Sequence, residues 1–72
     1  MDNINLRFAK TLRMLRTERN MTQEELAEKS GIDYKYLQKL EGQNPSSPTL
    51  STLEKLAKGL SITIIQLLAD IQ

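Results

Sequence analysis

Two helix-start signals stand only eleven residues apart in the stretch TQEELAEKSGIDYKYLQKLE, and this short spacing constrains the fold more than any other feature. Thr22 and Glu25 form a capping box, in which each side chain can bond the backbone N–H of the other residue. Asp33 is a second N-cap residue. Gly31 supplies the positive φ that a tight turn between two helices needs. The stretch therefore predicts one helix from Thr22 to the turn and a second from Asp33 to about Glu41.

Helical periodicity also dominates the rest of the chain. Apolar side chains recur at the spacing of one helical stripe from residue 5 to about residue 19, and Asn20 can end that helix. Beyond the loop GQNPSSP, Thr49 or Ser51 begins a fourth helix, and Thr63 begins a fifth with a T-x-x-Q capping box. No segment is a convincing strand, so the sequence predicts an all-α fold of five helices. The side chains expected to face the core are Phe8, Ala9, Leu12, Leu15, Leu26, Ala27, Leu53, Leu56, Ala57 and Leu60.

Length and composition limit what this chain can do. Its 72 residues predict one domain, residues 1–72, with a small core. It has no cysteine and no histidine, which removes disulfides, the usual zinc ligands and the usual general base at neutral pH. We therefore expect no metal, no cofactor and no enzymatic activity. The chain lacks a signal-peptide pattern and an apolar run of roughly 20 residues, so we expect a cytoplasmic protein without a membrane contact.

Charge is distributed unevenly, although the formal net charge is only +1. Residues 1–21 contain five basic and two acidic side chains, whereas residues 22–33 contain one basic and four acidic side chains. A near-neutral protein of this kind can present a basic face and an acidic back.

Residues 23–42 meet the requirements of a helix-turn-helix. Ala27 provides the small side chain that is needed where two helices cross closely. Ile32, Leu37 and Leu40 are the apolar residues that would anchor the second helix of the motif to the rest of the protein. These positions are specific in combination, whereas the alanine–glycine spacing alone is a weak signal.

The chain resembles the Cro/CI-type (XRE-like) helix-turn-helix regulators of phages and bacteria. The resemblance extends from FAKTLRMLR through TQEELAEKSGI and YLQKLEG to TLSTLEKLAKGLSITIIQLL, which is nearly the whole chain. It implies a five-helix, lambda-repressor-like domain that binds double-stranded DNA and regulates transcription. The D-x-x-Y-[IL] pattern around Tyr36 is also similar to the controller proteins of restriction-modification systems.

The resemblance also implies one structural ion pair. An arginine at the end of the first helix often pairs in this family with a glutamate at the end of the third, and Arg16 and Glu41 occupy these positions. Two solvated surface charges are the alternative. Glu41 follows Leu40 on the packed side of its helix, which favours the pair.

Helical geometry divides the second helix of the motif into two faces. With Leu37 and Leu40 turned inward, the outward face contains polar and basic side chains and no carboxylate. Lysine can donate to guanine and glutamine can pair with adenine in the major groove. Two tyrosines fall on opposite shoulders of the helix, outside the central core. From the matching positions in the family, the expected base-contacting residues are Tyr34, Lys35, Gln38 and Lys39.

Phosphate contacts are expected beside this face, because a helix N-terminus attracts anions. The loop GQNPSSP has no lysine or arginine, so its contacts would be neutral hydrogen bonds. The alternatives are a merely solvated lysine face and tyrosines that pack against neighbouring helices. Arg7, Lys10 and Arg13 are expected to face solvent. The expected phosphate-contacting residues are Thr22, Gln23, Tyr36, Gln43 and Asn44.

The last helix is more apolar than one short terminal helix can bury inward. This excess favours a homodimer on a pseudo-palindromic operator, because two helix-turn-helix units read two half-sites. The alternative is that these side chains simply complete a small core. Such a regulator would block RNA polymerase or touch it. Two other interpretations remain open, an antitoxin that binds its own promoter and an interaction module that no longer binds DNA. The expected interface residues are Ile64, Ile65, Leu68 and Ile71.

Overall fold

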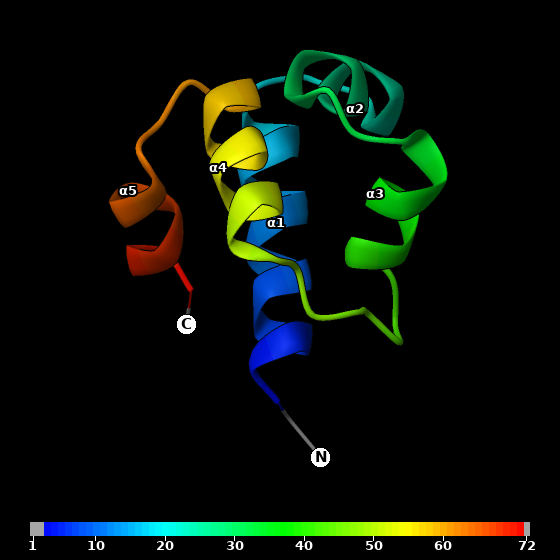
Figure 1. The fold of residues 1–72 in the computed structure, drawn as a ribbon, viewed down its shortest axis with the longest axis vertical. Helices are drawn as coiled ribbons and strands as arrows, with labels where there is room; N and C mark the ends of the chain where they lie inside the picture. Colours follow the sequence, from blue (N-terminus) through cyan, green and yellow to red (C-terminus); the bar gives the residue numbers. More distant parts are fainter. Residues whose placement is uncertain (1–2, 72) are drawn as a thin grey trace.

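The computed structural model describes residues 3–71. Over this range the chain forms five helices and no strand, as predicted. The long helix α1 runs along the molecule, with α2 across one end, α4 in front of it, and α3 and α5 on opposite sides (Figure 1). The helices are α1 (Ile4–Glu18), α2 (Gln23–Ser30), α3 (Tyr34–Leu40), α4 (Leu50–Gly59) and α5 (Ile64–Ala69).

Both predicted capping boxes are present. Thr22 Oγ1 accepts from the N–H of Glu25 at 3.1 Å, while the N–H of Thr22 donates to Glu25 Oε1 at 2.9 Å. Thr63 and Gln66 make the same reciprocal pair at the start of α5, with distances of 3.0 and 2.8 Å. Thr49, rather than Ser51, caps α4. Hydrogen bonds between residues close in the chain therefore define these helix starts without any tertiary contact.

The turns also follow the sequence signals. Gly31 ends α2 with a φ of 71°, the left-handed conformation that the tight turn requires. Asn20 has a φ of 56°, which confirms its expected place after the first helix. Asp33 Oδ2 accepts from the N–H groups of Lys35 and Tyr36 and so caps α3. The second helix of the motif therefore starts at a fixed point after the first.

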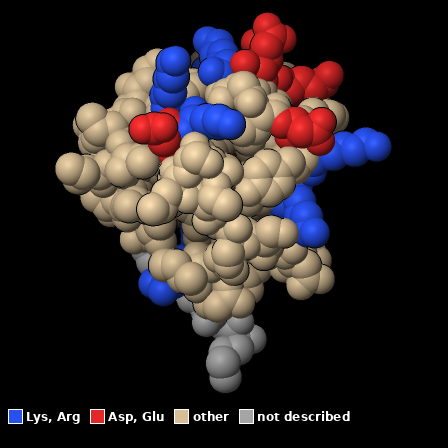
Figure 2. Space-filling view, viewed as in Figure 1, with Lys and Arg blue, Asp and Glu red and all other residues tan. Residues whose placement is uncertain are grey.

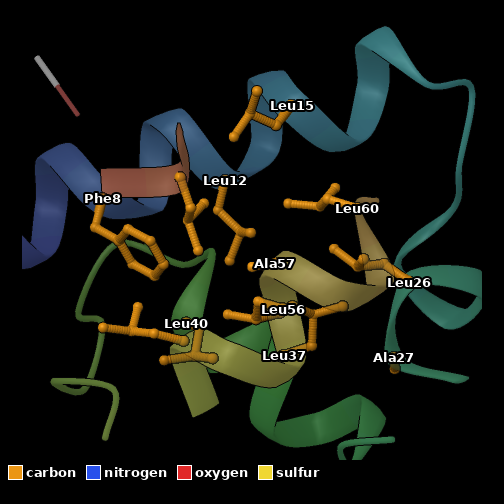
Figure 3. Packing of buried hydrophobic residues seen from close by; sticks show 12 residues of the cluster. Phe8, Leu12, Leu15, Leu26, Ala27, Leu37, Leu40, Leu56, Ala57 and Leu60 are labelled. Carbon is orange, nitrogen blue, oxygen red and sulfur yellow. The ribbon is translucent and has the colours of Figure 1, made fainter. Parts of the chain in front are cut away.

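The core is built from leucines of all five helices. In Figure 3, Phe8 and Leu12 of α1 point toward Leu56 of α4 and Leu40 of α3. Full burial of one such side chain stabilises the fold by about 1.5–3 kcal/mol. All of the side chains expected to face the core are buried. The fully buried large residues are Leu12, Leu26, Leu37, Leu40, Leu56, Leu60 and Leu67.

A close approach of α2 and α4 was not predicted from the sequence. A Cβ added at Gly59 would overlap the hydroxyl of Ser30 and lie 3.1 Å from its Cβ. The Ser30 hydroxyl is buried and has no hydrogen-bond partner among residues 3–71. Gly59 is therefore required by packing against α2 and not only by its place at the end of a helix.

Candidate nucleic-acid interface

The outward face of α3 is polar, basic and open to solvent. Leu37 and Leu40 are 0% exposed, which fixes the opposite face against the core. Lys35, Gln38 and Lys39 are exposed, where helical geometry predicted them. Basic groups project from the side of the molecule on which α3 lies (Figure 2). The face offers hydrogen-bond donors and one carboxamide without a competing carboxylate.

The two tyrosines of α3 have different environments. Tyr34 is 39% exposed, at the edge of the polar face. Tyr36 is half-buried and packs against the core cluster, and its hydroxyl lies 3.4 Å from Thr52 Oγ1 of α4. Neither ring is a central core residue, as expected, but Tyr36 shows the partial packing that was kept as the alternative. An amphipathic side chain on the shoulder of a helix can bury its ring and keep its hydroxyl near a polar partner.

The end of α3 is held by a polar cluster around Glu41. Arg16 Nε donates to Glu41 Oε2 at 2.8 Å and Arg16 Nη2 donates to Oε1 at 3.0 Å, which makes the pair bidentate. The Glu41 side chain is 1% exposed. Arg16 Nη1 also donates to the carbonyl of Met21 at 2.8 Å. The pair expected from the family is thus present and buried, with the geometry that makes arginine–carboxylate contacts strong.

Two further residues contact Glu41, and neither contact could be expected from the sequence pattern. Gln23 Nε2 donates to Glu41 Oε1 at 3.0 Å. Arg13 is exposed, as expected, and its Nη1 also donates to the Glu41 carbonyl oxygen. Both contacts join positions far apart in the chain, and only the packing of α1, α2 and α3 brings them together.

The expected phosphate-contacting residues other than Tyr36 lie at the two ends of the motif. Thr22, Gln43 and Asn44 are exposed. The first N–H groups of α2 have no intrahelical partner by geometry and can bind an anion. The side chain of Gln23, in contrast, is turned toward Glu41. The loop after α3 is attached to α1 where Asn5 Nδ2 donates to Ser47 Oγ at 2.9 Å.

The start of α2 also carries a fixed negative charge. The backbone N–H of Thr22 lowers the pKa of Glu25, the Thr22 hydroxyl lowers it further, and Lys29 adds a smaller effect in the same direction. Glu24 and Glu28 are exposed on the same helix. The first amides of α2 therefore attract a phosphate, while the exposed glutamates of the same helix repel it.

The side chain of Arg19 connects the carboxyl ends of α1 and α4. Arg19 Nε donates to the Leu60 carbonyl at 3.0 Å, and Arg19 Nη1 donates to the Leu15 carbonyl at 2.9 Å. A shallow hollow lined in part by Lys29 and Ser61 lies there, at the carboxyl ends of α1, α2 and α4. Arg19 satisfies carbonyl groups that the ends of α1 and α4 leave free.

The apolar residues of α5, together with Ile71 just after it, divide into two sets. Leu67 is fully buried, and Ile64 and Ile71 are half-buried against the core. Ile65 is 77% exposed and Leu68 is 43% exposed. The side of the molecule on which α5 lies shows few charged side chains (Figure 2). Of the four expected interface residues, Ile65 and Leu68 are therefore exposed, whereas Ile64 and Ile71 also pack against the core.

Two other kinds of site are absent from the part of the chain that the structure describes. Among residues 3–71, no group of three acidic side chains is arranged to hold a metal ion. No helix in this range is long and apolar enough to cross a membrane.

The comparison with protein families identifies the class. The family model described as helix-turn-helix matches residues 12–67 of this chain. This span contains the motif, α4 and the start of α5. The chain belongs to the helix-turn-helix family of DNA-binding transcriptional regulators.

Two relatives differ in how much of their length the chain matches. The HTH-type transcriptional regulator SutR of Escherichia coli (strain K12) is 39% identical over 62 residues, which cover 86% of this chain and 34% of SutR. Control protein C.MunI of Mycoplasma sp is 34% identical over 73 residues, which cover 100% of this chain and 97% of C.MunI. The chain thus spans about a third of SutR but nearly all of C.MunI.

A solved structure gives the same comparison in three dimensions. The restriction-modification controller protein C.Esp1396I, bound to a 19 base pair DNA duplex, is 29% identical and superimposes with a TM-score of 0.83. The match covers 99% of this chain and 99% of C.Esp1396I. The whole described architecture, and not the motif alone, is therefore shared with a protein whose structure was solved bound to DNA.

Proposed function

We propose that this protein is a controller-type transcriptional regulator that binds a pseudo-palindromic operator as a homodimer. The observation that carries the proposal is the exposed lysine and glutamine face of α3, held in place by buried Leu37 and Leu40. One α-helix fits the major groove of B-DNA, and the exposed side chains of α3 are donors and acceptors suited to base edges.

Each base-contacting residue has a chemical role in this proposal. Lys35 and Lys39 donate to guanine O6 and N7, and Gln38 pairs with the N6 and N7 of adenine. Tyr34, at the edge of the face, lays its exposed ring against a thymine methyl group or donates through its hydroxyl. Direct readout of this kind discriminates against a wrong base by about 1–3 kcal/mol for each good contact.

Phosphate contacts fix the register of α3 in the groove. Thr22, Gln43 and Asn44 supply exposed polar groups for them, and Gln23 supplies its main-chain N–H. Tyr36 contributes the exposed part of its side chain, with its hydroxyl near Thr52. Because the loop residues are neutral, the salt dependence of binding is modest and comes from the lysines.

Dimerisation brings two copies of α3 to two half-sites. Ile65 and Leu68 form the centre of the proposed interface, with Ile64 and Ile71 at its border with the core. A two-fold interface uses the same patch on both subunits, which suits one uncharged surface. Once bound at a promoter in the cytoplasm, the dimer either blocks RNA polymerase or touches it. Transcription in vitro from the bound promoter distinguishes these two outcomes.

The test begins with selection of bound sequences from a random pool of duplex DNA by the wild-type protein. Lys35→Ala combined with Lys39→Ala should then weaken binding to the selected duplex by at least a hundredfold, with unchanged helicity. Lys55→Ala combined with Lys58→Ala makes the same charge change on exposed positions of α4 and is the control. Equal affinity of the two double variants would sink the assignment of α3 as the reading helix. A stable complex with a toxin after co-purification would favour the antitoxin alternative instead.

A further inference from the structure

The two helices of the motif are connected at both ends. At one end the turn at Gly31 joins α2 to α3 through the backbone. At the other end Gln23, the first residue of α2, approaches Glu41, the residue that follows α3, and its Nε2 donates to Glu41 Oε1 at 3.0 Å. The second connection closes a hairpin of helices that would otherwise be open on this side.

The acceptor of this bond is itself immobile. Glu41 is bound through both carboxylate oxygens by Arg16 and through its carbonyl oxygen by Arg13. Its side chain is 1% exposed, so water hardly competes for the carboxylate. A hydrogen bond to a buried ionised acceptor is stronger and more directional than one between exposed neutral groups. The position of Glu41 therefore determines that of Gln23, and with it the start of α2.

The same bond also limits the side-chain contact that Gln23 can make with DNA. A phosphate oxygen accepts hydrogen bonds and needs a donor. The Nε2 of the carboxamide carries two N–H groups, and one of them is engaged by Glu41, so a single N–H remains for a phosphate. The exposed polar groups nearby, such as Thr22, face no such competition from Glu41.

We propose that Gln23 is a positioning residue of the DNA-binding surface. Through Glu41 it sets the separation between the start of α2, where backbone amides meet phosphate, and the end of α3, where side chains meet bases. Loss of the link lets these two sets of contacts move out of register, so sequence discrimination falls before affinity for DNA in general does. The proposal rests on the proposed function, because it takes α3 as the reading helix.

The first arm of the test measures binding of Gln23→Ala to two duplexes, the one selected by the wild type and a scrambled duplex of equal length. Affinity for the selected duplex should fall about tenfold, with affinity for the scrambled duplex unchanged. Gln43→Ala, the same substitution at a candidate phosphate contact, is the reference and should weaken both duplexes alike. If Gln23→Ala also weakens both alike, or weakens neither, the positioning role is wrong.

The second arm needs no DNA. In the free protein, the backbone N–H of Glu41 bonds the Leu37 carbonyl and that of Gly42 bonds the Lys39 carbonyl. Gln23→Ala should speed hydrogen exchange of these two amides about tenfold, with no change at the Leu12 amide in the core of α1. Unchanged exchange at the end of α3 would overturn the link. A wild type that selects no sequence would instead overturn the proposed function, while this arm still decides whether Gln23 holds α3.

Discussion

The helices α3 and α5 are both short, begin at a capped residue and end at an acidic one, yet they distribute polarity in opposite ways. In α3 the apolar residues are buried and the exposed residues are polar. In α5 Leu67 is buried, but Ile65 is 77% exposed and Leu68 is 43% exposed. The exposed side chains of α3 are polar groups that water can solvate, whereas α5 leaves apolar side chains in contact with water.

This difference indicates two kinds of partner. Exposed lysine and glutamine side chains are well hydrated in the free protein. They can exchange their hydrogen bonds to water for hydrogen bonds to base edges, which suits direct readout of DNA. Exposed isoleucine and leucine gain about 25 cal/mol for each Å² of apolar surface removed from water. The surface of α5 therefore favours association with another apolar surface, and a second copy of the same helix supplies one by symmetry.

The largest expected difference in unfolding free energy concerns substitution of the acidic residues that end the two helices. Glu41→Ala leaves the Arg16 guanidinium partly buried without its charge partner, which should cost about 3–5 kcal/mol of unfolding free energy. Asp70→Ala, at the exposed end of α5, should change it by less than about 0.5 kcal/mol. Urea unfolding of both variants, followed by circular dichroism, makes the comparison. Similar costs at the two positions would contradict the view that only α3 is fixed at its end.

Truncation of apolar side chains should follow the same division. Leu37→Ala removes a fully buried side chain of α3 and should cost about 2–5 kcal/mol. Ile65→Ala, measured at a protein concentration low enough to keep the chain monomeric, should cost less than about 0.5 kcal/mol. A large cost at Ile65 in the monomer would mean that its side chain serves the core and not an interface.

The exposed apolar pair of α5 should instead control assembly. Ile65→Ser combined with Leu68→Ser should shift sedimentation toward the monomer and leave the far-ultraviolet spectrum of the fold unchanged. It should also weaken operator binding, because one unit reads only one half-site. A wild type that stays monomeric at high concentration would refute the interface on α5.

The two tyrosines should separate stability from recognition within α3. Tyr36→Phe removes the contact with the Thr52 hydroxyl and should lower the unfolding free energy by about 0.5–1 kcal/mol. Tyr34→Phe should leave stability unchanged and act only on DNA binding, because Tyr34 lies at the exposed edge of the face. Thermal unfolding and duplex titration of both variants test the assignment. An equal loss of stability in the two variants would contradict it.

The division of α3 into two faces could be predicted from sequence because its leucines favour burial and its lysines favour water. Tyr36 could not be placed, since a tyrosine is compatible with core and water and its neighbour Thr52 lies on another helix. The contacts of Gln23 and Arg13 with Glu41 could not be predicted from the sequence for a related reason. They depend on how three helices cross, and neither residue belongs to a local pattern that requires such a partner.

The smallest expected difference is in the pH dependence of the unfolding free energy and concerns the two capping boxes. Only the box at α2 contains a titratable group. The pKa of Glu25 is lowered by its bonds to Thr22, so its ionised form stabilises the fold above the ordinary glutamate pKa. This contribution is lost as the pH falls through the lowered value. The difference in unfolding free energy between wild type and Glu25→Gln should therefore shrink steadily in acid. A difference that stays constant over this range would contradict the assignment.

The box at α5 provides the matched experiment, because its third residue is Gln66 and carries no charge. Gln66→Glu converts the α5 box into a copy of the α2 box, with a carboxylate that accepts from the N–H of Thr63 near the positive end of the helix. The variant should gain a stability term that is present at neutral pH and absent in acid. If Gln66→Glu gains no such term while Glu25→Gln loses one, the pH dependence belongs to the surroundings of α2 and not to the capping box itself.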